Sequence, residues 1–157
     1  MPINRLMRSA LVLAVAATSA CLDSTAPQGK SIEETEFAAS LGVDLAASTK
    51  TVNGAYYRDI VPGSGPAITT GKISVRYTGY LSNGVQFESN ISNANPLQFT
   101  FGQEEVIKGF EETLIGVKVG AKRQLIIPYD LAYGSFNYGP IPGNSNLVFM
   151  VEVVSAP

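Results

Sequence analysis

The sequence contains no histidine, no tryptophan and a single cysteine among its 157 residues. Without histidine, the chain has no histidine acid–base catalysis, no Ser-His-Asp or Cys-His nucleophile system, and none of the imidazole ligands that most zinc sites use. The single cysteine, Cys21, cannot form a disulfide within the chain. These absences exclude several common classes of hydrolase and metalloenzyme.

The sequence also has no surplus of positive charge. It contains 11 Lys and Arg residues against 13 Asp and Glu residues, so the formal net charge is −2. Because electrostatic binding to nucleic acid depends on clustered Lys and Arg, we expect no nucleic-acid partner. The length and the 45% hydrophobic content suit one ordinary domain with a tail.

An apolar run near the N-terminus, Ala10–Ala17, is too short to cross a bilayer. Arg5 and Arg8 precede this run, and the small residues Thr18–Ala20 follow it directly before Cys21. A basic start, an apolar centre and a small-residue end are the layout of a secretory signal peptide. The sequence therefore predicts a signal peptide over residues 1–20.

The position of the cysteine resembles that in bacterial lipoprotein signals, in which the cysteine is lipidated and becomes the mature N-terminus. The resemblance implies an exported protein held in the bacterial cell envelope by a lipid on Cys21. The residue after the cysteine is Leu22 and not Asp. In bacteria with two membranes, this residue suits a lipoprotein sorted to the outer membrane, facing the periplasm. Thr18 stands where lipoprotein signals usually have Leu. The alternative to a lipoprotein signal is an ordinary signal peptide in which Cys21 has no role.

Residues 21–50 are expected to form a tether with a short helix. Leu22–Ser31 is small, polar and contains Pro and Gly, which predicts a flexible linker. Ser31 and Glu34 have the spacing of a capping box, which predicts a helix from Ile32 to about Leu41. We expect this helix to pack on the domain as an appendage, because its apolar stripe is too short to favour dimerisation.

The folded domain is expected over residues 51–157, with one amphipathic helix near its middle. Acidic residues in the first turn, Glu104 and Glu105, suit the helix dipole, and Gly116 predicts the end of the helix. Four apolar residues share one helical face at 3.6 residues per turn: Val106, Ile107, Phe110 and Leu114.

Nearly all the other patterned segments are strand-like. Ile73–Leu81 alternates, and Asn83-Gly84 predicts a two-residue hairpin turn to a return strand at Val85–Glu88. Further strands are predicted at Ala55–Val61, Leu97–Phe101, Lys122–Ile127 and Leu147–Val154. Five or six antiparallel strands wrapped on one helix give an α+β fold. The long loop Tyr129–Asn146, with three Gly and two Pro, is a candidate functional segment.

Four stretches resemble the FKBP family of peptidyl-prolyl cis-trans isomerases: VRYTGYLSNGVQFESN at 75–90, FGQEEVIKGFEETLIGVKVGAKRQLIIP at 101–128, LAYG at 131–134 and LVFMVEVV at 147–154. Together they extend over residues 52–155 in the family's order and spacing. The resemblance implies a half-open antiparallel sheet wrapped around one short helix. It also implies an enzyme that rotates Xaa–Pro bonds in proline-containing polypeptides, assists the folding of exported proteins, uses no cofactor or metal, and can be inhibited by a macrolide. We expect a monomer.

The resemblance places the active site in an apolar, aromatic-lined pocket between the helix and the sheet. Phe110 is the expected floor, where many members have Trp; Glu88 replaces the usual Asp, and Leu97 replaces a common aromatic residue. The segment from Tyr133 to Ile141 is about one residue shorter than is usual. The residues that match the family's site are Tyr77, Phe87, Glu88, Val106, Ile107, Phe110, Tyr133, Ile141 and Phe149.

Taken alone, aromatic residues at alternate strand positions and an apolar helix face indicate core packing rather than a site. Two other functions also remain open. A module that binds Pro-containing segments without turnover would keep the same fold, and a structural lipoprotein of the envelope would have no pocket. The loop Tyr129–Asn146 is too short to contain an inserted chaperone flap, so we expect weak holdase activity.

Overall fold

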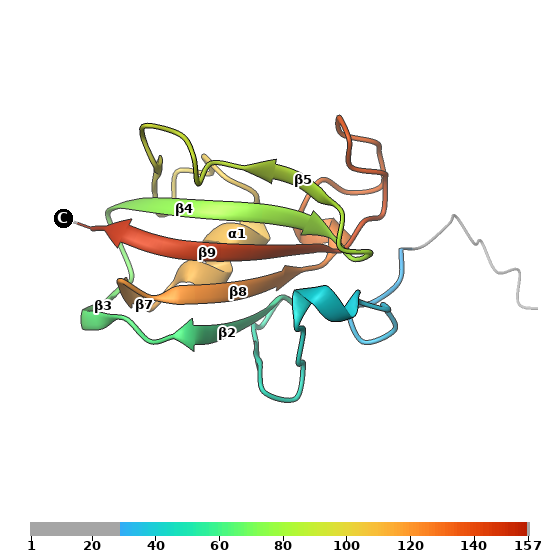
Figure 1. Cartoon of the computed structure of the whole chain (residues 1–157), viewed down its shortest axis with the longest axis horizontal. Coiled ribbons are helices and arrows are strands. Elements are labelled where there is room, and N and C mark those ends of the chain that lie inside the picture. The colour runs from blue at the N-terminus through green and yellow to red at the C-terminus, as the bar shows by residue number, and fades with distance from the viewer. Residues whose placement is uncertain (1–28, 157) are drawn as a thin grey trace, which may run out of the picture.

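In the computed structural model, the described part of the chain is residues 29–156. The expected signal peptide, Cys21 and the start of the tether therefore lie outside the described residues. Among the described residues, an antiparallel sheet curves around a single α-helix, α1 (Lys108–Leu114), which lies against its concave face (Figure 1). This arrangement confirms the expected α+β fold, an antiparallel sheet wrapped around one short helix.

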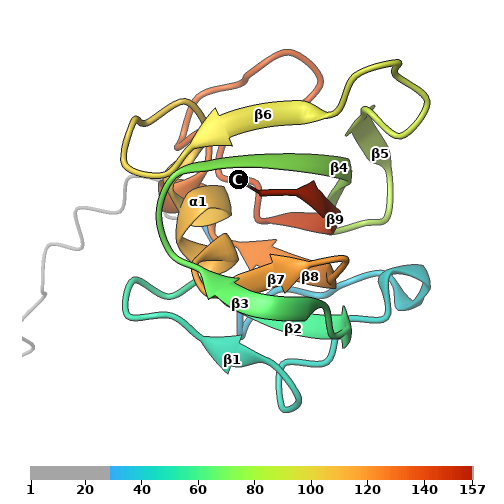
Figure 2. The same ribbon diagram turned by 90° about the vertical axis from the view of Figure 1, so that its left-hand side faces the viewer.

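Within residues 29–156, nine strands form two sheets. The main sheet has the order β1-β2-β8-β9-β4-β5, with β6 also paired to β4, and the second sheet joins β3 to β7. Figure 2 shows α1 enclosed between β6 on one side and the β3–β7 and β8 strands on the other. The strands are β1 (Thr49–Lys50), β2 (Tyr56–Val61), β3 (Ser64–Ile68), β4 (Lys72–Leu81), β5 (Gln86–Ser89), β6 (Leu97–Thr100), β7 (Val117–Val119), β8 (Lys122–Ile127) and β9 (Leu147–Ser155).

The structure has more strands than the five or six that the sequence predicts. The additional ones are β1, which is two residues long, and the pair β3 and β7. β3 contains Gly65 and Pro66, and β7 is only three residues long, so neither gives a clear strand pattern in the sequence. Two short 3₁₀-helices, Ala39–Leu41 and Tyr129–Leu131, complete the elements. No helix among the described residues is long and apolar enough to span a bilayer.

The main core lies between α1 and the concave face of the sheet. Its sheet side includes the predicted apolar face of β4, with Ile73 and Val75 fully buried. The helix side contributes Phe110 and Leu114, as its periodicity predicts. A side chain at Gly109 would collide with Ile127 of β8, so this glycine lets the helix backbone approach the sheet closely.

The helix begins later than the sequence predicts. Glu104 and Glu105 precede α1 instead of forming its first turn. The Glu105 carboxylate accepts a hydrogen bond from the Thr100 N–H at 2.6 Å, so it ties the pre-helix segment to the end of β6. The predicted helix end is confirmed, because α1 ends at Leu114, Ile115 is its C-cap residue, and Gly116 follows with a φ of 80°.

The hairpin between β4 and β5 forms, but the predicted two-residue turn is wrong. The turn extends over residues 82–85, and the Leu81 N–H donates to the Val85 carbonyl at 2.9 Å. Only Gly84 of the Asn83-Gly84 pair has a positive φ. The Asn83 side chain instead accepts a hydrogen bond from the Val85 N–H, which favours a wider turn.

The predicted helix at Ile32–Leu41 is wrong, although its capping bonds form. Ser31 and Glu34 exchange the two hydrogen bonds of a capping box, but one turn follows, then extended chain, and the 3₁₀-helix Ala39–Leu41 ends the segment. Ile32 is only 2% exposed because it packs on Ile126 and Val148, on the convex face of the sheet. This packing draws the segment out along the sheet rather than into a helix. The domain boundary at residue 51 stays a prediction, yet the residues before it cover part of the sheet.

Glu33 makes a second contact between this N-terminal segment and the sheet. Its carboxylate accepts hydrogen bonds from the Lys50 ammonium and the Tyr56 hydroxyl, both at 2.6 Å. These bonds, that of Lys50 first, lower the pKa of Glu33 to about 2. The Lys50 and Glu33 side chains are about half exposed, so this pair fixes geometry more than it adds stability.

Arg123 on β8 joins three elements at the C-terminal end of the helix. Its guanidinium donates two hydrogen bonds to the Asp59 carboxylate of β2, at 2.7 and 2.9 Å. It also donates to the Thr113 carbonyl in the last turn of α1, at 2.9 Å. The residue is 4% exposed, so the guanidinium is a buried charge with its partners in place.

We expect Arg123→Met to lower the free energy of unfolding by about 3 kcal/mol, because it leaves Asp59 and the helix carbonyl without their donor. Urea unfolding of the full chain measures this value. The matched control is Lys122→Met on the neighbouring residue, whose ion pair with Glu152 is half exposed and should be worth less than about 1 kcal/mol. Equal losses in the two variants would contradict a structural role for Arg123.

Candidate active site

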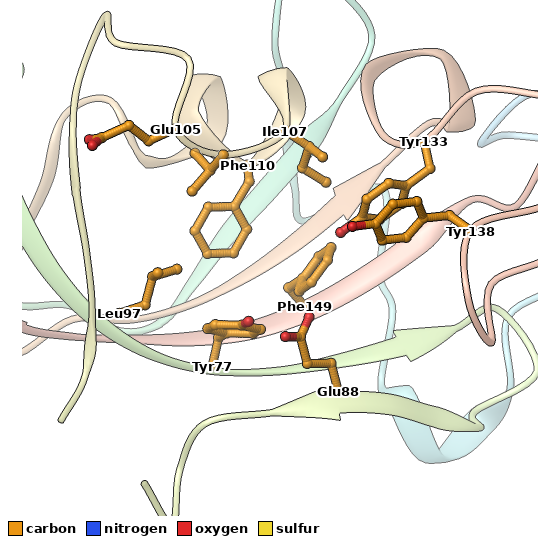
Figure 3. A pocket seen from close by; sticks show the side chains of 10 residues that line it. Tyr77, Glu88, Leu97, Glu105, Ile107, Phe110, Tyr133, Tyr138 and Phe149 are labelled. Atoms are coloured by element: carbon orange, nitrogen blue, oxygen red, sulfur yellow. The ribbon is translucent and has the colours of Figure 1, made fainter. Parts of the chain in front are cut away.

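A cavity of about 260 Å³ opens on the concave side of the sheet, beside the N-terminal end of α1 (Figure 3). Its wall comes from the helix, from strands β4, β5, β6 and β9, and from the long loop that joins β8 to β9. The residues that line it are Tyr77, Glu88, Leu97, Glu105, Val106, Ile107, Phe110, Tyr133, Tyr138 and Phe149.

Three aromatic rings form the base of the cavity. Phe110 from the helix meets Phe149 from β9 edge to face, with ring centroids 5.3 Å apart. Tyr77 from β4 lies 5.8 Å from Phe110 and 6.0 Å from Phe149. Phe110 meets both other rings edge to face, and Tyr77 and Phe149 are tilted at 60° to each other. Aromatic contacts at these distances are favourable, so each ring restrains the other two.

Phe87 and Phe149 meet over a glycine. Gly79 on β4 pairs directly with Phe149 on β9, and the two rings lie 5.6 Å apart above it. A Cβ atom at Gly79 would lie 2.6 Å from the Phe87 ring and 2.8 Å from the Phe149 ring. The absence of a side chain at this position therefore lets Phe149 lean over the strand.

The long loop supplies two stacked tyrosines. The rings of Tyr133 and Tyr138 lie 4.4 Å apart and nearly parallel, at 11°. Figure 3 shows both hydroxyl groups directed toward the centre of the cavity. Paired backbone hydrogen bonds between Tyr138 and Ile141, each 2.9 Å, hold the tip of this loop.

Burial raises the pKa of the Tyr77 phenol well above its ordinary value, and the neighbouring Glu88 carboxylate adds to the shift. Burial also raises the pKa of Tyr133, again with a contribution from Glu88. Both phenols therefore stay protonated at neutral pH and can donate hydrogen bonds. The site combines an apolar base with hydroxyl donors at its edge, and two carboxylates, Glu88 and Glu105, stand at the rim.

Seven of the nine residues expected at the site line the cavity, and two lie outside its lining. Phe87 packs behind Phe149, and Ile141 is buried in the core beneath Tyr138, at 4% exposure. Sequence reasoning missed Tyr138 and Glu105. Tyr138 lies in the loop Tyr129–Asn146, which the sequence indicates as a candidate functional segment. No sequence pattern indicates Glu105 as a site residue, because a glutamate beside a helix usually faces solvent.

Among residues 29–156, no group of three His, Cys, Asp or Glu side chains is placed to hold a metal ion. The cavity can instead enclose a small apolar group while the tyrosine hydroxyl groups contact polar atoms beside it. Ile107, which lines the cavity, is also the N-cap residue of α1, and its apolar side chain cannot accept a hydrogen bond from the first N–H groups of the helix. No side chain among the described residues therefore caps this end of the helix.

The family model, the similar sequences and the similar solved structures all indicate the same protein family. The family model of FKBP-type peptidyl-prolyl cis-trans isomerases matches residues 65–154. An FK506-binding protein from Neisseria meningitidis is 40% identical over 105 residues, which are 66% of this chain and 96% of that protein. FK506-binding protein 4 of Dictyostelium discoideum is 46% identical, also over 66% of this chain.

The chain spans only 28% of the Dictyostelium FK506-binding protein 4, and 63% of a second Dictyostelium relative, FK506-binding protein 2. Two solved structures resemble the fold. AtFKBP13 has a TM-score of 0.63 at 33% identity and covers 70% of this chain and 98% of its own. FkpA from Escherichia coli has a TM-score of 0.62 at 34% identity, over 69% of this chain and 51% of that one.

We expect Gly79→Ala to lower the free energy of unfolding by about 2 kcal/mol and to change the near-ultraviolet circular dichroism, because the new methyl group displaces Phe87 and Phe149. The control is Gly102→Ala, where no atom lies within 4 Å of the new methyl group, although φ is 83° there and unfavourable for alanine, unlike the extended backbone at Gly79. The control should lose some stability and keep the aromatic signal. An unchanged aromatic spectrum in Gly79→Ala would contradict the ring packing described above.

Proposed function

Because this chain belongs to the family of FKBP-type peptidyl-prolyl cis-trans isomerases, we propose that it catalyses rotation about Xaa–Pro peptide bonds in proline-containing polypeptides. The observation that carries this proposal is the cavity of about 260 Å³ on the concave face, whose base is formed by the rings of Tyr77, Phe110 and Phe149. The family model covers the elements that build this cavity, from β4 to β9.

The chemistry requires neither proton transfer nor a nucleophile. Amide resonance opposes rotation with a barrier of about 20 kcal/mol, so the uncatalysed reaction takes tens of seconds or more. In the twisted transition state the amide loses its double-bond character and its charge separation. An apolar pocket favours this less polar state over the planar amide, which water solvates better. The absence of histidine therefore removes nothing that this reaction needs.

We assign the base of the pocket to the proline ring. Phe110 lies beneath it, and Tyr77 and Phe149 enclose it from the sheet. Val106 and Ile107 close the helix side. In this proposal the backbone N–H of Ile107 and the hydroxyl of Tyr133 would hold the flanking carbonyl groups, which would orient the bond for rotation. Phe87 and Ile141 support the wall from behind, through Phe149 and Tyr138.

We infer that the same cavity can accept a macrolide inhibitor. Relatives of this chain are named for binding FK506, and this chain has the aromatic base and the apolar helix entrance that a macrolide would contact. Phe110 and Glu88, which stand where many members have Trp and Asp, reshape the floor and the rim. These two positions should therefore set macrolide affinity more than they set turnover.

A cis-to-trans assay on Xaa–Pro tetrapeptides tests the isomerase. We expect fast turnover by the full chain, blocked by a macrolide, and about tenfold slower turnover in Tyr133→Phe, because one hydrogen bond to the substrate is lost. Tyr80→Phe makes the same chemical change outside the cavity lining and serves as the control. A well-folded chain with only background isomerisation would instead support a module that binds Pro-containing segments without turnover.

We further propose that the chain is exported and carries a lipid on Cys21 in the bacterial cell envelope, where it assists the folding of exported proteins. The sequence order of a basic start, an apolar run, small residues and Cys21 supports this proposal. The segment from Cys21 to Gly29, where the described structure begins, spans at most about 28 Å. A lipid on Cys21 would therefore keep the isomerase close to the bilayer surface.

Expression of the full chain in a bacterium with labelled fatty acid tests the anchor. We expect label in the wild-type protein and its recovery with membranes, and neither in Cys21→Ser. Ser24→Cys in the Cys21→Ser background is the control for the position of the thiol and should remain unlabelled. Unlabelled wild-type protein recovered in the soluble fraction would favour an ordinary signal peptide.

A further inference from the structure

The two ends of the long loop that carries Tyr133 and Tyr138 are joined to each other. We call this junction, formed by Tyr129 and Asn146, the neck of the loop. The Oδ1 atom of Asn146, at the end of the loop, accepts a hydrogen bond from the Tyr129 N–H at its start, at 2.9 Å. Two further backbone bonds continue from this neck: Gly134 N–H to the Tyr129 carbonyl at 2.8 Å, and Asn144 N–H to the Gly134 carbonyl at 2.9 Å. The backbone next to Tyr133 is therefore fixed by the neck.

The other end of the Asn146 amide holds the N-terminal segment. Its Nδ2 atom donates to the Lys30 carbonyl at 2.8 Å and to the Thr35 hydroxyl at 2.7 Å. Asn146 is only 4% exposed, so water does not replace these partners. Asn146 and the residues that it holds lie more than a hundred residues apart in the sequence, and the segment and the loop lie side by side at one end of the sheet (Figure 1).

A second contact joins the same two parts of the chain. Gly29 lies so close to the Tyr129 ring that a Cβ atom there would lie 2.5 Å from two ring carbons. The chain thus passes directly over the neck before Ile32 enters the small core on the convex face. The N-terminal segment restrains the neck by packing as well as by hydrogen bonds.

We propose that Asn146 is a positioning residue, which holds the Tyr133 loop at the cavity by joining its neck to residues 30–35. The catalytic consequence rests on the isomerase function proposed above. Only an asparagine-sized amide can accept from the Tyr129 N–H and donate to two acceptors at once. Aspartate would keep the acceptor and lose the N–H donors, whereas alanine would lose every hydrogen bond of this side chain.

The proposal predicts more than a loss of stability. If Asn146 acts through the loop, its replacement should release the Gly134 amide to hydrogen exchange and reduce turnover while the chain remains folded. If Asn146 only stabilises the fold, exchange at Gly134 should change no more than exchange elsewhere. A suitable control removes a different contact between the same N-terminal segment and the sheet. Tyr56→Phe removes the hydrogen bond from the Tyr56 hydroxyl to Glu33, away from the neck.

The experiment compares Asn146→Ala, Asn146→Asp and Tyr56→Phe in the full chain, at a temperature where urea unfolding shows each to be folded. We expect Asn146→Ala to speed exchange at Gly134 at least tenfold and to lower kcat/KM for a tetrapeptide about tenfold. Asn146→Asp should have an intermediate effect, and Tyr56→Phe should stay within twofold of the wild type. If Asn146→Ala does not fold, Thr35→Val replaces it, with a smaller change expected in the same direction.

Unchanged exchange and turnover in Asn146→Ala would overturn the proposal, as would equal effects in Tyr56→Phe. The two measurements separate this proposal from the proposed function. If the wild-type chain does not isomerise peptides, the proposed function fails, while exchange at Gly134 still decides whether Asn146 holds the loop.

Discussion

The limited length of α1 is the constraint on which the rest of the structure depends. A helix of seven residues is about 10 Å long, whereas the ten residues of β4 extend for about 33 Å. The helix therefore covers only part of the concave face. The pre-helix segment and the long β8–β9 loop border the remainder, and the space between them is the cavity over Tyr77, Phe110 and Phe149. The candidate site is thus the uncovered part of the core.

One end of a short helix and a long loop border this cavity. Contacts outside the cavity must therefore fix the positions of both. Arg123 fixes the C-terminal end of α1 to β2 and β8 through charge-assisted hydrogen bonds. Glu105 ties the segment before the helix to the end of β6. Asn146 closes the neck of the loop and joins it to the N-terminal segment. The side chains that would touch a substrate are few, and their positions depend on these polar contacts at the edges.

Features with a local pattern could be predicted from the sequence. The alternation of β4, the apolar face at Phe110 and Leu114, and the helix end at Gly116 are confirmed, and the family's motifs brought seven of the nine expected residues to the cavity lining. Features set by distant contacts could not be predicted. The helix expected at Ile32–Leu41 is wrong because Ile32 packs on β8 and β9, and no periodicity reports a partner a hundred residues away. Tyr138 joins the site through a stack with Tyr133, which depends on the loop's fold.

The most direct test of this account is exchange NMR spectroscopy of an Xaa–Pro peptide with a small amount of the chain. Catalysis in this cavity predicts rapid exchange between the cis and trans peptide signals, together with shifts of the Phe110 and Phe149 ring resonances when the peptide is in excess. Shifts of these rings without faster exchange would contradict catalysis. Faster exchange without shifts at these rings would contradict the assignment of the cavity left uncovered by α1.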